Sequence, residues 1–319
     1  MRGVNLCIFD FDFDLTWAAF FIGPDQSVYG RYGGRDAASP DGQTSLAGLR
    51  HAMAQALAMH ARAPTTKPLA GAVHTADEYP AAMRRPPNSC IHCHHVYDFR
   101  REALLAESKW RRDELWVYPL PENVGLTLEV DQGDLVKFVA RNSPADRAGL
   151  RAGDRLRILN GINVAAIADV QYGLQRAPAS GQIPVTWARG DVLQSGRLNL
   201  APGWRQTDIS WRWSLRGVEP SPGVDGEDLS GADKKRLGLS AKRLAFYQSA
   251  YVSTPARQAG IHANDVIVGV DNKPLQMSAR QFLAYIRLNF KVGDQVTYNL
   301  IRNGKPLDIP MTLSSRPPL

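Results

Sequence analysis

The sequence predicts an α+β chain of several domains, and three features support that prediction. Residues 143–164 align without gaps with residues 254–275, so the second half of the chain holds an internal repeat at an offset of 111 residues. The first sixty residues combine strand-like and helical patterns, and a Pro-rich stretch then leads into cysteines and histidines at residues 90–95. With 319 residues, 44% of them hydrophobic, the chain can bury more than one core.

The N-terminal region begins with strand-like patterns. "FDFDFDL" at residues 9–15 alternates aromatic and acidic residues with period two, which predicts a half-buried strand. "TWAAFFIG" (16–23) continues as a more buried strand, "PDQS" makes a turn, and "VYGRYGG" (28–34) returns as its partner. We therefore expect a strand hairpin here.

A predicted helix follows this hairpin in "TSLAGLRHAMAQALAMH", residues 44–60. Its apolar residues recur at helical spacing: Leu46, Leu49, Met53 and Leu57. A hairpin followed by a helix resembles the C-terminal half of a thioredoxin-like fold, which we assign to residues 1–63. The half that would carry the redox C-x-x-C is missing from this region, so the resemblance implies no disulfide exchange here.

The repeat in the second half has a recognisable pattern. "SPADRAGLRAGDRLRILNGINV" (143–164) and "TPARQAGIHANDVIVGVDNKPL" (254–275) share S/T-P-A-x-x-A-G, an aspartate and a strand that ends in a turn. This pattern closely resembles PDZ domains of the bacterial HtrA-associated type. We place the two domains at residues 119–202 and 234–315. The Trp-rich stretch between them, 203–233, is predicted to pack the two domains together.

The PDZ resemblance implies peptide binding. Such domains add an extended peptide as a strand at a sheet edge and hold its terminal carboxylate with backbone N–H groups. The loops that resemble this element contain a Gly-Leu step in each copy: Val124, Gly125, Leu126, Thr127 and Leu128 in the first, and Leu237, Gly238, Leu239 and Ser240 in the second. The alternative is that one or both grooves are blocked and the domains act as spacers or dimerisation surfaces.

PDZ domains of this type often accompany a serine protease, which needs a nucleophile in a glycine-flanked turn with a His and an Asp. The sequence contains no G-x-S-G stretch; "PASGQIP" and "QSGRLNL" lie inside the first predicted PDZ domain. The histidines also cluster away from any such serine. We therefore expect no protease triad and a chain without enzymatic activity.

The ligand-rich cluster is "SCIHCHHVYD", residues 89–98, and it fits C-x-x-C-H, the attachment motif of c-type haem. Cys90 and Cys93 would form the thioether bonds, and His94 would be the proximal iron ligand. Met83 is the candidate sixth ligand, and a vacant site is an alternative. Other candidates for that position are His74, His60 and His51. We assign residues 64–118 to a linker and this haem-binding segment.

Two other chemistries fit the same cluster. The two cysteines with two of His92, His94 and His95 could bind Zn²⁺ or copper, because tetrahedral and soft-ligand sites use this mixture. Cys90 and Cys93 could also form a thiol–disulfide pair.

The overall charge and hydropathy restrict partners and location. The net charge of +7 is spread over segments that read as folded, so we expect no nucleic-acid binding. No apolar run reaches the roughly 18 residues of a membrane-spanning helix. The N-terminus lacks the parts of a signal peptide. Because haem attachment requires export, we interpret the start as truncated and expect a periplasmic location, or a cytoplasmic one if Met1 is the true start.

The whole arrangement resembles bacterial exported proteins that join a thioredoxin-like segment, a C-x-x-C-H segment and PDZ domains. From it we predict a periplasmic haem c protein that transfers electrons or senses redox state, with PDZ domains that bind protein or peptide C-termini and a possible redox partner. The alternative is a non-enzymatic PDZ scaffold with a structural zinc or copper site.

Overall fold

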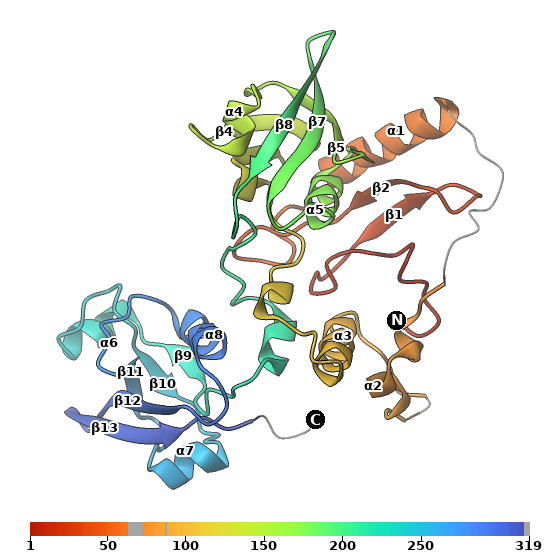
Figure 1. The fold of residues 1–319 in the computed structure, drawn as a ribbon. Helices are drawn as coiled ribbons and strands as arrows, with labels where there is room; N and C mark the ends of the chain where they lie inside the picture. The colour runs from red at the N-terminus through yellow and green to blue at the C-terminus, as the bar shows by residue number, and fades with distance from the viewer. Residues whose placement is uncertain (63–72, 87, 316–319) are drawn as a thin grey trace. The chain divides into compact units, whose positions relative to one another are not determined.

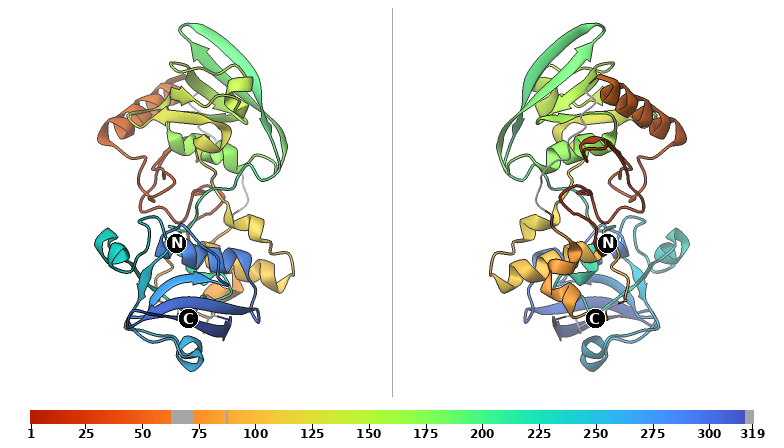
Figure 2. Two further views of the ribbon diagram at one scale, coloured as in Figure 1. Left: turned by 90° about the vertical axis from the view of Figure 1, so that its left-hand side faces the viewer. Right: turned by 90° about the vertical axis from the view of Figure 1, so that its right-hand side faces the viewer.

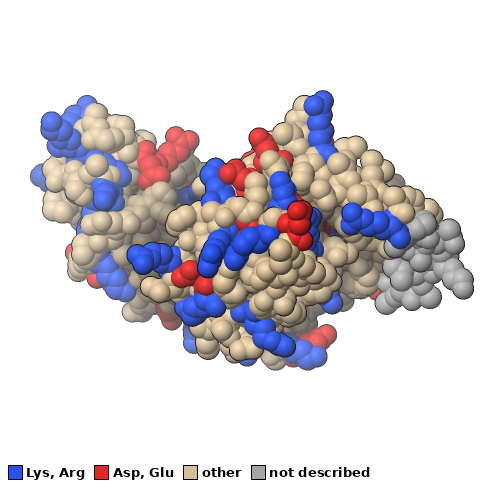
Figure 3. Space-filling view, turned by 90° about the horizontal axis from the view of Figure 1, so that it is seen from above, with Lys and Arg blue, Asp and Glu red and all other residues tan. Residues whose placement is uncertain are grey.

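The computed structural model describes residues 1–62, 73–86 and 88–315, which form two compact units, Met1–Asp208 and Ile209–Leu319 (Figure 1). Both units mix helices with antiparallel sheet, and each contains one copy of the sequence repeat. In the part of the chain that is described, no helix is long and apolar enough to cross a membrane. On the face shown in Figure 3, basic and acidic side chains are interspersed.

The N-terminal hairpin forms as predicted, but "FDFDFDL" is not a strand. Strands β1 (Ala19–Ile22) and β2 (Val28–Tyr32) pair antiparallel, whereas residues 9–15 form turns and bends. The acidic side chains explain the difference, because Asp12 accepts a hydrogen bond from the backbone N–H of Asp14 and so favours a local turn. The likeness of this region to half of a thioredoxin fold stays a prediction.

Helix α1 (Leu46–Arg62) follows the hairpin, but it buries a different face from the predicted one. Its buried residues are Gly48, Ala52 and Ala56, at a spacing of four, while Leu46 and Leu57 are largely exposed. A Cβ on Gly48 would lie 2.4 Å from the carbonyl oxygen of Val130. Small residues therefore allow α1 to lie directly against the first copy of the repeat (Figures 1 and 2).

The segment around the cysteines is helical and has its own small core. It comprises η1 (Ala76–Glu78), α2 (Pro80–Met83), α3 (His95–Ala106) and η2 (Arg112–Leu115). That core combines residues from three parts of unit 1: Leu6, Phe13, Ala76, Ala81, Ala82, Ile91, Val96 and Phe99. The predicted linker falls partly on residues 63–72, which lie outside the described residues.

The first copy of the repeat is a sheet in the order β3-β4-β5-β7-β8, with β6 paired to β5. Its elements are η3 (Pro121–Val124), β3 (Leu126–Glu129), β4 (Gln132–Val139), α4 (Pro144–Arg147), β5 (Arg155–Leu159), β6 (Ile162–Asn163), α5 (Ile167–Gln175), β7 (Gly181–Arg189) and β8 (Val192–Leu200). Apolar residues that alternate along these strands form one core with α5.

The second copy has a sheet in the order β13-β12-β11-β10-β9. Unit 2 comprises η4 (Trp213–Gly217), β9 (Gly226–Asp228), α6 (Gly231–Arg236), β10 (Phe246–Gln248), α7 (Thr254–Ala259), β11 (Val266–Val270), α8 (Ala279–Asn289), β12 (Gln295–Arg302) and β13 (Lys305–Thr312). Strand β9 lies upstream of residue 234, within the stretch that the sequence assigned to a linker.

Candidate functional site

One glycine has the same structural role in both copies of the repeat. Gly125 and Gly223 take left-handed conformations, with φ of 85° and 74°, just before β3 and β9. Each lies against the serine that caps the following short helix, Ser143 in the first copy and Ser253 in the second. The hydroxyl of Ser253 donates to the carbonyl oxygen of Gly223 at 2.7 Å. The loop before β9 is therefore the counterpart of the loop before β3.

This equivalence changes the candidate peptide-binding loop of the second copy. The predicted residues, Leu237, Gly238, Leu239 and Ser240, follow α6, where Gly238 takes φ of 70° and the N–H of Leu239 bonds the carbonyl of Lys234. The strand beside β10 is β9, so the loop that leads into the sheet edge is residues 221–224. Residues 237–240 do not lead into this edge, because residues 229–245 insert α6 where the first copy has a tight hairpin, and their predicted role in peptide binding stays a prediction.

In the first copy, the predicted loop lies at the sheet edge as expected. Val124 ends η3, Gly125 makes the left-handed turn, and Leu126, Thr127 and Leu128 lie in β3. Strand β3 is the terminal strand of its described sheet. A peptide-binding role for these five residues stays a prediction.

Helices α5 and α8 are also equivalent. Their N-cap residues are Ala166 and Ser278, and the third helical residue of each, Asp169 or Gln281, accepts a hydrogen bond from the N-cap backbone N–H. Both bury an apolar stripe in their own core: Ile167, Val170 and Leu174 in α5, and Ala279, Phe282 and Ile286 in α8. Counted from these caps, Arg280, Leu283, Ala284 and Arg287 of α8 correspond to Ala168, Gln171, Tyr172 and Gln175 of α5.

In the second copy, one face of α8 borders a hollow of about 730 Å³. This face comprises Arg280, Leu283, Ala284 and Arg287. The hollow runs along the loop of residues 221–224 and the start of β9, so it lies beside the sheet edge. Most of the remaining lining comes from the Trp-rich stretch, and Tyr251 and Ser253 complete it. The residues of that stretch are Ser210, Trp211, Arg212, Trp213, Leu215, Arg216 and Val218. We call this hollow the second groove.

In the first copy, the N-terminal segment of the same unit covers the corresponding face of α5, which comprises Ala168, Gln171, Tyr172 and Gln175. The guanidinium of Arg31, on β2, lies 3.5 Å from the ring centroid of Tyr172. It also forms an ion pair with Asp169 at 3.6 Å, while the backbone N–H of Arg31 donates to the same carboxylate at 2.9 Å. Burial raises the pKa of Asp169 to about 6, although the Arg31 charge acts in the opposite direction.

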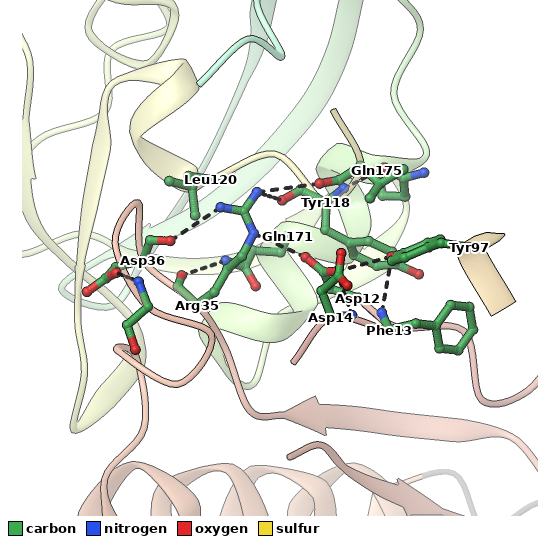
Figure 4. A network of polar contacts seen from close by, with 12 residues as sticks. Asp12, Phe13, Asp14, Arg35, Asp36, Tyr97, Tyr118, Leu120, Gln171 and Gln175 are labelled. Atoms are coloured by element: carbon green, nitrogen blue, oxygen red, sulfur yellow. Dashed lines mark hydrogen bonds and ion pairs between the residues drawn. The ribbon is translucent and has the colours of Figure 1, made fainter. Parts of the chain in front are cut away.

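Arg35 continues this cover, as Figure 4 shows. Its guanidinium is 1% exposed, bonds Asp12 at 3.1 Å and donates to the carbonyl of Tyr118 at 2.9 Å. From α5, Gln171 donates to the carbonyl of Arg35 at 3.0 Å, and Gln175 accepts from the N–H of Tyr118 at 2.7 Å. This cover and the core of the domain together bury seven of the nine residues of α5.

The Cys/His cluster lies elsewhere in unit 1, at the start of α3. Cys90 is exposed, Cys93 is half-buried, and both are free thiols. The three imidazole rings are close, with centroids 4.4 Å apart for His94 and His95 and 5.2 Å for His92 and His95. Burial is the main cause that lowers the pKa of His95 to about 4 and also lowers that of His94.

Within residues 1–62, 73–86 and 88–315, no three His, Cys, Asp or Glu side chains are arranged to hold a metal ion. Nδ1 of His95 accepts a hydrogen bond from the backbone N–H of His92. Haem attachment at Cys90 and Cys93, and a zinc or copper site with His92, His94 and His95, stay predictions.

The candidate sixth ligands are distributed over different environments. Met83 ends α2 with 70% of its surface exposed. The three histidines each have another partner: His51 bonds Asp134, His60 bonds Tyr29, and His74 bonds Glu78. Nothing in the described structure singles one of them out as an iron ligand.

Comparison with known proteins identifies both copies of the repeat. Residues 135–189 and residues 241–313 each match the PDZ domain family, so the chain contains two PDZ domains. They cover less than half of the chain. The sequence repeat and the two sheets agree with this assignment.

The chain is similar to periplasmic serine proteases of the HtrA type. It is 27% identical over 186 residues to the periplasmic serine endoprotease DegP of Salmonella typhimurium, with 56% of this chain and 36% of the relative covered. It is 28% identical over 195 residues to the periplasmic pH-dependent serine endoprotease DegQ of Escherichia coli, with 60% and 37% covered. The chain thus spans well under half the length of these relatives.

A solved structure of the HtrA-type protease AlgW with a decapeptide is 22% identical, with 32% of this chain and 31% of that chain covered and a TM-score of 0.27.

These relatives overturn the predicted function. A haem c protein for electron transfer or redox sensing, and the alternative of a non-enzymatic scaffold with a metal site, are contradicted because the relatives are serine proteases. The expectation of a non-catalytic chain has no support from them either, and the expected redox partner has none. Their periplasmic location agrees with the expectation of export. A five-residue motif is a weaker indicator of function than a repeat of two whole domains.

Proposed function

We propose that this chain is the polypeptide-binding part of an exported protein of the HtrA type, and that its second PDZ domain captures the peptide. The observation that carries the proposal is the second groove, which lies between α8 and the edge of the sheet at β9. A peptide placed there extends the sheet by one strand, which is how PDZ domains bind their ligands.

The loop before β9 supports this mode of binding. The left-handed Gly223 turns the chain so that successive backbone groups of residues 223–226 border the groove. Consecutive N–H groups in such a turn form a concave site for an anion, here the terminal carboxylate of the peptide. Leu283 and Ala284 provide an apolar floor for the last side chain of the peptide.

The first PDZ domain has a different role in the proposal. Its groove helix, α5, contacts the N-terminal segment of the same chain at Arg31 and Arg35. That segment occupies the side of α5 that a peptide would need. The first domain therefore holds the N-terminal region in place, and peptide capture falls to the second.

Proteolysis is left out of the proposal. The relatives are proteases, but the 319 residues contain no serine in a G-x-S-G context. The proposal concerns binding alone, and a peptide-binding assay tests it directly.

The test uses the whole chain and fluorescein-labelled peptides with free, apolar C-termini, followed by fluorescence anisotropy. Leu283→Gln removes apolar floor from the second groove and should weaken binding about tenfold, about 1.4 kcal/mol. Leu307→Gln is the matched control, because Leu307 lies on β13, is 38% exposed and does not line the groove. Absence of binding by the wild-type chain, or equal weakening by both variants, would contradict the proposal.

A further inference from the structure

The second groove has a strongly basic lining. Four arginines and one acidic residue border it: Arg212, Arg216, Arg280, Arg287 and Asp225. They come from two separate elements, the Trp-rich stretch and α8. A cleft lined by one sign of charge concentrates ligands of the opposite sign.

The two arginines of α8 lie at the ends of its apolar floor. Arg280 is exposed in the first turn of the helix, and Arg287 lies two turns later, with Leu283 and Ala284 between them. Arg287 donates to the carbonyl of Leu283 at 3.1 Å, which fixes its position on the helix. The first turn of α8 has no acidic residue of its own. Asp228, the acidic residue next to this turn, accepts from the N–H of Ala279 at 2.8 Å.

In the first PDZ domain, a charged residue on the groove helix pairs with an oppositely charged residue of the segment that covers the helix. There the helix presents a carboxylate, Asp169, and the segment that covers it brings a guanidinium, Arg31. In the second domain, Gln281 stands at the position of Asp169, and the helix presents the opposite charge at other positions, through Arg280 and Arg287. The complementary occupant of the second groove is therefore acidic.

We infer that the second groove selects the C-terminus of a partner protein that carries an acidic side chain close to an apolar last residue. This inference rests on the proposed peptide-binding function and adds the ligand class. The terminal carboxylate lies at the loop of residues 221–224, the apolar side chain lies on Leu283 and Ala284, and the acidic side chain pairs with Arg280. Arg280 is thus a specificity-determining residue.

The test compares three peptides of equal length that share the same apolar last residue and differ by Glu, Gln or Lys at the upstream positions. At low ionic strength we expect the Glu peptide to bind the wild-type chain at least about tenfold more tightly than the Lys peptide. The gap should narrow at high salt, because the arginine is exposed to screening. Amidation of the last residue should weaken all three peptides.

A charge reversal then tests the residue itself. Arg280→Glu should reverse the preference in favour of the Lys peptide, whereas Arg257→Glu, the same change on α7 away from the groove, should leave the order unchanged. Equal binding of the three peptides to the wild-type chain would overturn the inference and leave the proposed function standing. Failure of every peptide to bind would overturn the proposed function itself. An unchanged preference in Arg280→Glu would overturn the assignment of Arg280.

Discussion

The two PDZ domains share a fold and a loop glycine, yet one groove helix is covered and the other borders a hollow. In the first domain, α5 packs on one side against its own core and is covered on another by residues 12–35 and 117–118 of unit 1. In the second domain, the corresponding stripe of α8 faces about 730 Å³ of space. The comparison shows that access to a PDZ groove depends here on a segment outside the domain.

The cover of the first groove is held by buried charges. Arg35 and Asp12 are each about 1–2% exposed, and Asp169 is fully buried beside Arg31. Loss of one partner from such a pair leaves an uncompensated charge away from water. We therefore expect the segment that covers α5 to contribute to the stability of unit 1. The following substitutions test whether the first domain differs from the second in this way.

The largest effect is expected for Arg35→Ala. This change leaves the carboxylate of Asp12 buried without the guanidinium and removes the donor to Tyr118, so we expect unit 1 to lose about 3–5 kcal/mol of unfolding free energy. Arg111→Ala is the control, because its ion pair with Asp113 is exposed on both sides and should contribute at most about 1 kcal/mol. Urea denaturation measures both values, and equal losses would argue against a cover held by Arg35.

The same variant tests whether the cover blocks binding. If Arg35→Ala remains folded at low urea, the groove beside α5 in the first PDZ domain should become accessible to peptide. The number of peptides bound per chain, measured by isothermal titration, should then rise from one to two. A stoichiometry of one in a folded variant would show that the first domain does not bind peptide even when its cover is loosened.

A smaller, pH-dependent effect is expected from Asp169. Its folded pKa, about 6, lies above the ordinary value of 3.8 for an aspartate, so the folded state binds the proton more tightly than the unfolded state. The resulting stability is fully present below about pH 4 and is lost as pH rises through 6. Relative to Asp169→Asn, which has no such titration, the wild-type chain should therefore lose up to about 3 kcal/mol between pH 4 and pH 7. Denaturation curves of both proteins at several pH values measure this difference, and parallel pH profiles would contradict it.

The sequence alone was sufficient for the two PDZ domains but not for the state of their grooves. The repeat at residues 143–164 and 254–275 follows short-range rules, in which a proline starts a helix, a glycine ends it and a strand follows. The cover, in contrast, joins Arg31 to Asp169 across 138 positions, and no local pattern marks such a pair. The loop that leads into the sheet edge of the second copy differs from the predicted residues 237–240 because α6 interrupts the repeat, although the Gly-Val step at residue 223 is visible in the sequence.

The cluster at residues 90–95 teaches the opposite lesson. Its spacing is a strong local pattern, but spacing alone does not arrange side chains around a metal, and the described structure forms no such arrangement. His94 is the N-cap residue of α3, and His95 is its first residue. Haem attachment and metal binding at this motif stay predictions.

The smallest effect compares the two loop glycines directly. Both have positive φ, so Gly125→Ala and Gly223→Ala each introduce about 1–2 kcal/mol of backbone strain. The new methyl group at 125 would lie 2.1 Å from Cβ of Ser143, an atom fixed by the capped turn of α4, whereas at 223 its nearest neighbour is the flexible end of Met311 at 2.6 Å. We therefore expect Gly125→Ala to destabilise its unit more than Gly223→Ala does, by about 1 kcal/mol or more, as measured by thermal and urea unfolding. A larger loss of unfolding free energy at residue 223 would contradict this expectation. It would mean that the loop beside the second groove is packed more tightly than the loop of the first domain, although the second groove is open.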